Sequence, residues 1–465
     1  MRFYKENPTA YLNFLRAQYE AMTGQVRVWS YPYVMYVDPS SVCQLRCPGC
    51  PTGVENESKR IRQPISLRER TMMTSDLYDS LLDEVGQYLF CLQLYNWGEP
   101  LLHRQLPTFV RKAKEYQICV VTHTNLSLHL TDTYLEELLE SGLDVIAASV
   151  DGFSPETYQT YRRGGNFELV KTNVERLAAM RNRLNSQTEI IWNFLVFRWN
   201  EHEVGAARRF CDETGIVFER REAYVQDPEW LPSYRQQEAE GLRRTTRHSA
   251  RPQVSRREWC NWHYTCSVVN SNGSISPCCA PWEQQHDFGL LEPGKMRFGD
   301  IWNNELYQKS RGVFANRSVP GLENVDSLCL RCPFGTGVQS MDSHMDDLVI
   351  DRFLRVFRGR DSLLEEAFRQ LPNRERFLAY YSRHMDELHV TETEYKAPLQ
   401  PPRSERPLGL LAWPLKHSFR LWLRRVRQRA LHRIVRLANR YPGLYAGGYI
   451  ALYRWGRILH RFRDQ

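Results

Sequence analysis

The sequence predicts an α/β fold: a partial (β/α)6 TIM-like barrel, followed by a small cysteine-rich C-terminal extension and additional C-terminal helices. Six apolar or β-branched runs recur at intervals that leave room for a helix between them. Continuous apolar strands that alternate with helical patterns are typical of a parallel sheet. The pattern changes near Asp227, where a polar linker leads into a cysteine-rich stretch. In such a barrel we expect the chemistry at the C-terminal ends of the strands.

The elements are expected in the following order. A short helix over Pro8–Met22 precedes the first strand. The predicted strands, which read as buried on both faces, are residues 33–38, 88–95, 118–125, 144–151, 189–197 and 216–224. Helical patterns at 75–89 and 130–142 lie between strands, and the second begins at a Thr131 cap and stops at Gly142. Residues 271–276 indicate a short strand and turn, and 341–395 a return to helix.

These patterns divide the chain into six segments. They are a helical lead (1–29), the barrel (30–227), a linker (228–258), the cysteine-rich domain (259–340), a helical region with a proline-containing linker (341–405) and a basic tail (406–465).

The composition is that of a folded chain of more than one domain, with 465 residues, 42% of them hydrophobic and 25% charged. No run of eighteen apolar residues and no signal-peptide pattern occurs, which predicts a cytoplasmic protein. There its twelve cysteines are expected to stay reduced, so metal ligation is favoured over disulfides.

The net charge of +8 is concentrated in the tail. Residues 406–465 carry fourteen Lys and Arg against one acid, Asp464, so that the other residues sum to 8 − 13 = −5. Apolar and aromatic residues recur there at helical spacing among the arginines. This pattern suits a peripheral position on an anionic inner membrane face, or a basic helical hairpin docked on the acidic body. No nucleic-acid partner is expected, because the barrel lacks a supporting basic and aromatic pattern.

Cys43, Cys47 and Cys50 form a CX3CX2C cluster directly after the first predicted strand. Three thiolates on one loop can ligate three irons of a four-iron cluster and leave the fourth iron open. A structural zinc site is the alternative, but it needs a fourth ligand, and the next cysteine or histidine along the chain is Cys91.

This triad resembles the signature of the radical S-adenosylmethionine (SAM) superfamily. Residues 96–100 (NWGEP), after the second strand, resemble that family's GGEP motif, with Trp97 in place of the first glycine. The resemblance implies that Glu99 accepts hydrogen bonds from the methionine ammonium group. Glu-Pro at a helix start and Asp-Gly at a turn are the structural alternatives for such motifs. The cofactor-binding residues that the resemblance implies are Gly98, Glu99, Asn125, Ser149, Asp151 and Arg162.

Four later cysteines resemble the SPASM/twitch extension of the same superfamily. Cys260 precedes a GX4C pattern that ends at Cys278, and Cys329 and Cys332 follow as CX2C. The resemblance implies one fully ligated auxiliary [4Fe-4S] cluster. A zinc ribbon is the alternative, although the spacing from Cys278 to Cys329 is long for one.

Cys266 and Cys279 adjoin these ligands without fitting the ligand pattern. Each is a candidate catalytic residue that supplies a hydrogen atom to a substrate radical, or a substitute for a neighbouring ligand. Cys91, Cys119 and Cys211 are expected to be small buried residues.

The resemblance implies that SAM on the open iron is cleaved to a 5′-deoxyadenosyl radical that abstracts hydrogen from a substrate. Only about 30 residues precede the first strand, so we expect no leader-peptide domain and favour oxidation or epimerisation of a small sugar-type or lipid-linked sugar substrate. The expected electron donor is a flavodoxin or ferredoxin. The rival functions are a peptide maturase and a non-catalytic, zinc-stapled adaptor at a membrane surface.

Overall fold

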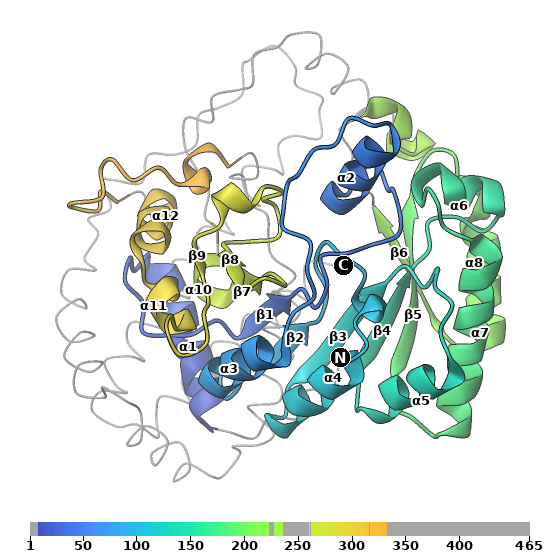
Figure 1. Cartoon of the computed structure of the whole chain (residues 1–465), viewed down its shortest axis with the longest axis horizontal. Helices are drawn as coiled ribbons and strands as arrows, with labels where there is room; N and C mark the ends of the chain where they lie inside the picture. Colours follow the sequence, from blue (N-terminus) through green and yellow to red (C-terminus); the bar gives the residue numbers. More distant parts are fainter. Residues whose placement is uncertain (1–7, 223–226, 236–259, 261, 316, 333–465) are drawn as a thin grey trace, which may run out of the picture. The chain divides into compact units, whose positions relative to one another are not determined.

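The structure is a computed structural model that describes residues 8–222, 227–235, 260, 262–315 and 317–332 (Figure 1). The helical region expected at 341–405, the amphipathic tail expected at 406–465 and most of the linker at 228–258 lie outside the described residues. Within the described residues, no helix combines the length and the apolar character needed to cross a membrane.

One sheet of nine strands organises the described chain. The strands are β1 (Val34–Val37), β2 (Cys91–Gln93), β3 (Cys119–Thr124), β4 (Val145–Ser149), β5 (Glu189–Val196), β6 (Val217–Glu222), β7 (Cys266–Val269), β8 (Ser274–Ser276) and β9 (Gly289–Leu290). Their order is β6-β5-β4-β3-β2-β1-β7-β8-β9. All pairs from β6 to β7 are parallel, and β8 and β9 add antiparallel strands at the other edge.

Helices lie between the barrel strands as the sequence predicts, and others precede or follow the sheet along the chain. They are α1 (Pro8–Thr23), α2 (Pro51–Arg60), α3 (Ser75–Val85), α4 (Leu106–Glu115), α5 (Asp132–Glu140), α6 (Pro155–Tyr161), α7 (Phe167–Arg183), α8 (Val204–Thr214), α10 (Trp262–Thr265), α11 (Phe298–Trp302) and α12 (Glu305–Ala315). Helices α3, α4, α5, α7 and α8 run along one side of the sheet (Figure 1). The core forms there, where alternate strand residues such as Leu92, Val120 and Trp192 are fully buried.

Local signals that the sequence contains also set the helix ends. The Thr131 side chain accepts a hydrogen bond from the Tyr134 amide, which confirms the predicted cap of α5. Gly142, just after α5, has φ +88°, a conformation that glycine adopts without strain.

One expectation about the strands is wrong. The other five predicted barrel strands are largely buried, but residues of β6 are partly or fully exposed along its length. β6 is the edge strand of the sheet, and its sequence VFERRE carries charges that discourage edge pairing with other chains.

The cysteine-rich extension is continuous with the barrel sheet. β7 pairs with β1 in parallel, with Val34 opposite Cys266 and Tyr36 opposite Val268. The first barrel strand therefore lies between β2, which belongs to the barrel, and β7, which belongs to the extension. This arrangement places the loop after β1 at the junction of the two regions.

Candidate functional site

The loop between β1 and α2 carries Cys43, Cys47 and Cys50. Asn56 on α2 holds this loop, because its Nδ2 donates to the Cys43 carbonyl oxygen at 2.8 Å. Gly53 lets α2 start beside the loop, since a Cβ there would lie 2.2 Å from the Cys47 carbonyl oxygen. Local contacts therefore hold the backbone at Cys43 and let α2 pack closely against Cys47.

The three thiols share one partly buried environment. Cys47 is buried, and Cys43 and Cys50 are partly exposed. Burial raises the pKa of all three, that of Cys47 to about 11, although Arg162 acts on Cys47 in the opposite direction. The nearby Cys47 and Cys50 also contribute to the raised pKa of Cys43. Thiols of this kind ionise when a metal supplies positive charge.

The segment after β2 packs tightly on the cysteine loop. A Cβ on Gly98 would lie 1.5 Å from the Ser40 carbonyl oxygen, so only glycine fits there. The Glu99 amide donates to the Val42 carbonyl oxygen at 2.8 Å. In this structure Gly98 thus allows close backbone approach, and the approach brings Glu99 to the loop.

Glu99 is a buried carboxylate, 1% exposed, held by three donors. Its Oε1 accepts from Thr124 Oγ1 at 2.6 Å and from the Leu101 amide at 3.0 Å, and its Oε2 accepts from the Asn125 amide at 2.7 Å. Burial raises the pKa of Glu99, and the Thr124 and Asn125 donors oppose that shift. Oε2 retains accepting capacity for one more donor, as an ammonium group requires.

Asn125 links Glu99 to the first cysteine. Its Nδ2 lies 3.6 Å from Cys43 Sγ, and its Oδ1 accepts from Gln44 Nε2 at 2.9 Å. The side chain predicted to bind cofactor therefore already orders the cysteine loop.

Asp151 and Arg162 form a buried ion pair near the loop. Arg162 Nε donates to Asp151 Oδ2 at 2.6 Å, and the Leu195 amide donates to Oδ1 at 2.9 Å. Arg162 lowers the pKa of Cys47, so its positive charge acts on the cysteine loop. Ser149, at the end of β4, is partly exposed on the same side of the sheet as Asp151.

The side of the sheet opposite the helices, here called the inner face, carries polar and aromatic residues. It includes Tyr36, Gln93, His123, Ser149 and Asn193, which alternate along their strands with residues of the core. The His123 ring stacks on Tyr95, with centroids 4.2 Å apart. Burial and nearby arginines lower the pKa of His123 to about 3, so its ring is neutral.

Two side-chain amide oxygens on the inner face lack hydrogen-bond partners among the described residues. Among the described residues, Oε1 of Gln93 and Oδ1 of Asn193 make no hydrogen bond, although the side chains are only 2% and 6% exposed. Buried polar atoms are normally satisfied, so unpaired ones at one face indicate positions for a ligand.

Asp38, directly after β1, is a buried acid at the junction of barrel and extension. It is 1% exposed, and its Oδ2 accepts from the Trp97 amide at 3.4 Å. Its Oδ1 has no partner among the described residues. Burial raises the pKa of Asp38 to about 7, and the neighbouring Arg68 only partly offsets this.

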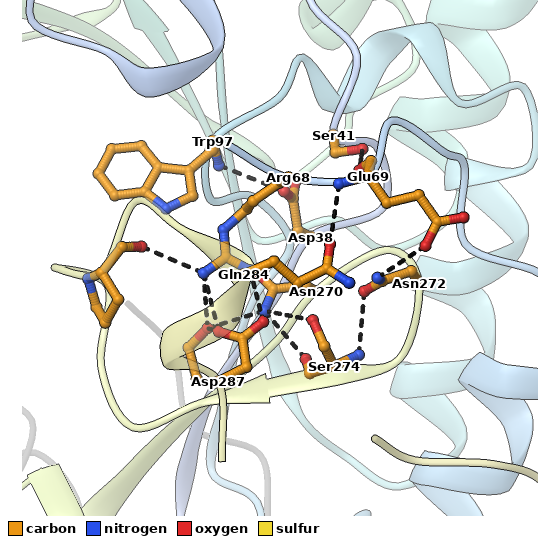
Figure 2. Close-up of polar contacts among 12 residues, drawn as sticks. Asp38, Ser41, Arg68, Glu69, Trp97, Asn270, Asn272, Ser274, Gln284 and Asp287 are labelled. Carbon is orange, nitrogen blue, oxygen red and sulfur yellow. Dashed lines mark hydrogen bonds and ion pairs between the residues drawn. The ribbon is translucent and has the colours of Figure 1, made fainter. Parts of the chain in front are cut away.

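Figure 2 shows why Arg68 does not neutralise Asp38. The Arg68 guanidinium pairs with Asp287 through two bonds of 2.7 and 2.9 Å, and both side chains are nearly buried. Ser276 on β8 also donates to Asp287, at 2.5 Å. The barrel segment that carries Arg68 is therefore fastened to the extension by a bidentate ion pair.

The second cysteine set comes from separate segments. Cys278 follows β8, and Cys329 and Cys332 lie at the 3-10 helix η6 (Leu328–Arg331). Cys329 and Cys260 both contribute to the raised pKa of Cys278, which places their thiols near one another. Cys329 lies in η6 and Cys332 directly follows it as its C-cap, so the two cysteines are close along the chain.

The remaining cysteines occupy different places. Cys279 acts on the pKa of both Tyr36 and Tyr95 and therefore lies near the inner face. Cys266 is the first residue of β7 and pairs with the first residue of β1, away from the loop that follows β1. Cys91, Cys119 and Cys211 are fully buried, as predicted.

Sequence reasoning missed His263, which lies beside the second set. Its Nε2 is 3.3 Å from Cys329 Sγ. It also missed Asp38, Gln93, His123 and Asn193. Polar residues at alternate positions within apolar strands were the signal that could have found the last three.

The donor sets fit iron-sulfur clusters. Among the described residues, no three His, Cys, Asp or Glu side chains converge on a single metal ion. Each thiolate of a four-iron cluster binds a different iron, so such a cluster does not require convergence on one point. Three thiols on the first loop would leave one iron open, whereas the four of the second set would close a cluster.

Family comparisons identify these two regions. Residues 37–191 match the model of the radical SAM superfamily, and residues 260–333 match the SPASM iron-sulfur cluster-binding domain. The chain therefore contains a radical SAM domain. More particularly, it combines this domain with a SPASM domain, and the two domains imply SAM, a [4Fe-4S] cluster and auxiliary iron-sulfur binding as cofactors.

Curated relatives each match less than a third of the chain. A probable GTP 3′,8-cyclase of Methanococcus maripaludis is 30% identical over 132 residues, which are 28% of this chain and 42% of the relative. The GTP 3′,8-cyclase of Chlorobaculum tepidum is 28% identical over 144 residues, 30% of this chain and 39% of the relative. The chain thus spans about two fifths of the length of these relatives.

Solved structures resemble more of the chain at lower identity. The anSMEcpe structure with bound AdoMet is 16% identical, with a TM-score of 0.41, and covers 76% of this chain and 99% of that chain. BtrN in complex with AdoMet and 2-DOIA is 18% identical, with a TM-score of 0.36, and covers 62% and 88%. Streptococcus suis SuiB bound to its precursor peptide SuiA is 14% identical, with a TM-score of 0.45, and covers 64% and 70%.

Proposed function

We propose that this radical SAM enzyme oxidises or epimerises a sugar-type substrate held against the inner face of the sheet. The observation that carries the proposal is that the unpaired Gln93 and Asn193 oxygens lie on the same face of the sheet as the stacked Tyr95 and His123 rings. A sugar presents hydroxyl donors to such oxygens and C–H faces to such rings.

The residues that would hold the cofactors follow from the cysteine sets. Cys43, Cys47 and Cys50 would ligate the core cluster, with Glu99 and Asn125 at the methionine end of SAM. Cys260, Cys278, Cys329 and Cys332 would ligate one auxiliary cluster. When bound, these groups supply a 5′-deoxyadenosyl radical that removes a hydrogen atom, and an electron acceptor.

Asp38 supports the oxidation branch. Its Oδ1 has no partner among the described residues, and its pKa of about 7 lets it take up a hydroxyl proton near neutral pH. It would hold that proton while the substrate carbon becomes a carbonyl.

Cys279 supports the epimerisation branch. It lies near Tyr36 and Tyr95 on the inner face, and a thiol can donate a hydrogen atom to a carbon radical. Cys266 is the second candidate, because it also contributes to the raised pKa of Tyr36.

One anaerobic experiment separates these outcomes. The reconstituted enzyme is incubated in D2O with SAM, dithionite and a panel of free, nucleotide-linked and lipid-linked sugars, with unmodified peptides as the comparison. We expect a sugar to increase 5′-deoxyadenosine release. Loss of two hydrogens from the sugar indicates oxidation, and one solvent deuterium on carbon indicates epimerisation. Turnover of peptides alone would contradict the proposal and favour a peptide maturase.

The proposal also includes an electron-donor protein and a membrane surface as partners. A flavodoxin or ferredoxin would reduce the core cluster. The tail, outside the described residues, would bring the enzyme to an anionic membrane surface, since each arginine near such a surface contributes about 1 kcal/mol. Deleting residues 408–465 should abolish co-sedimentation with phosphatidylserine-containing liposomes, and absence of binding by the full chain would refute this part.

A further inference from the structure

His263 is a buried histidine that none of the proposed cofactor roles uses. It lies on α10, three residues after Cys260, and is 2% exposed. Its ring is packed among aromatic side chains, with centroid distances of 5.5 Å to Phe314, 6.0 Å to Tyr307 and 6.4 Å to Phe288. A polar ring in such surroundings needs a specific partner.

The partner of the His263 ring is a cysteine of the auxiliary set. Nε2 lies 3.3 Å from Cys329 Sγ, and Nδ1 makes no hydrogen bond among the described residues. The Cys329 side chain is itself only 6% exposed.

The backbone under His263 is also fixed. Arg311, which is fully buried, donates from Nε to the His263 carbonyl oxygen at 2.9 Å and from Nη2 to the Trp302 carbonyl oxygen at 2.7 Å. These bonds tie α10 to the C-terminal end of α11. They hold the imidazole in place against the cysteine.

The contact has a defined direction once Cys329 is a thiolate. A thiolate only accepts, so the proton must be on Nε2, and Nδ1 is left without a proton in its apolar surroundings. An N–H donor to a cluster sulfur withdraws charge from it and favours the reduced, more negative cluster.

We propose that His263 donates an Nε2–H hydrogen bond to the Cys329 thiolate and thereby raises the reduction potential of the auxiliary cluster. The proposal rests on Cys329 being a cluster ligand but not on the sugar substrate. His263 is a positioning residue in this role, because it acts on the electron acceptor through a ligand.

The test uses the full chain with Cys43, Cys47 and Cys50 replaced by alanine, so that only the auxiliary cluster forms. Midpoint potentials are measured by EPR-monitored redox titration without SAM or substrate. In this background His263→Phe removes the donor and keeps a flat ring, whereas His263→Gln restores an N–H at a similar reach.

We expect His263→Phe to keep its iron and to shift the reduced-to-oxidised ratio about tenfold toward oxidised, equivalent to about 59 mV for one electron. His263→Gln should recover part of that shift. An unchanged potential in both variants overturns the proposal, as does loss of cluster iron in both, which would make His263 a ligand or a purely structural residue. Absence of iron in the triple-alanine parent would also overturn the proposal, because it would show that Cys329 does not ligate an auxiliary cluster. None of these readouts depends on which substrate the enzyme takes.

Discussion

The two cysteine sets are built in opposite ways. The first lies within eight residues on one loop, and the adjacent α2 supplies Asn56 and Gly53 to hold it. The second is gathered from segments around Cys260, Cys278 and η6, which only the folded extension brings together. A local set loses little chain entropy when it closes around a metal, whereas a dispersed set depends on tertiary structure. The comparison teaches that the first site is a property of a loop and the second a property of a domain.

The largest effect is expected when the local set is broken. Cys47→Ala removes one of three ligands that no neighbour replaces, so 5′-deoxyadenosine release should disappear and iron should fall by about half. Iron and sulfide analysis with a nucleoside assay measures both. Cys211→Ala, at a buried cysteine outside both sets, is the matched control. Retained nucleoside release in Cys47→Ala would contradict the assignment of Cys47 as a ligand of the core cluster.

Removing a ligand of the dispersed set should separate auxiliary-cluster binding from SAM cleavage. In Cys329→Ala we expect about half of the iron to be lost. Slow 5′-deoxyadenosine release from SAM and dithionite should persist, because the loop of the first set does not depend on η6. Loss of both clusters on this single change would show that the two sites are not independent.

A smaller effect is expected from the carboxylate beside the loop. Glu99→Gln should weaken SAM binding about 10- to 100-fold, because a hydrogen bond to a charged group is lost. Equilibrium dialysis with the reconstituted enzyme measures the affinity. Glu115→Gln, at an exposed position on α4, should leave it unchanged. Equal affinity in the Glu99 variant would place the ammonium site elsewhere.

The last effect is on stability and not on activity, and it concerns Asp38, between the two sets. Its carboxyl ionises near pH 3.8 when unfolded and near 7 when folded. Its contribution to stability is therefore complete below about pH 4 and is lost as the pH rises through about 7. Asp38→Asn should stabilise the protein at pH 8 relative to the parent, by up to about 4 kcal/mol, and much less at pH 5.

Anaerobic denaturant unfolding at pH 5 and pH 8 measures this difference. Asp76→Asn, at an exposed position of α3, serves as the control. A stability difference that is the same at both pH values would contradict the assigned ionisation of Asp38.

Sequence reasoning predicted the succession of strands and helices along the chain and the first cysteine set, because both depend on local residue patterns. Thr131 caps the N-terminus of α5, and Gly142 follows its C-terminus, as their residue types predict. The exposure of β6 was missed because the sequence of a strand does not show whether neighbouring strands pair with it on both sides. His263 and Asp38 were missed for a related reason, because the role of each depends on residues far along the chain. His263 contacts Cys329, and Asp38 lies at the junction with the extension.

The parallel pairing of β7 with β1 has a consequence for electron transfer. One strand carries the first cysteine loop at its end and the extension along its side, so hydrogen bonds of a sheet would set the separation of the two proposed clusters. The Arg68–Asp287 ion pair also joins the two regions. A hinge between the regions would have to break these sheet hydrogen bonds, so the separation of the two proposed clusters would be fixed when the chain folds.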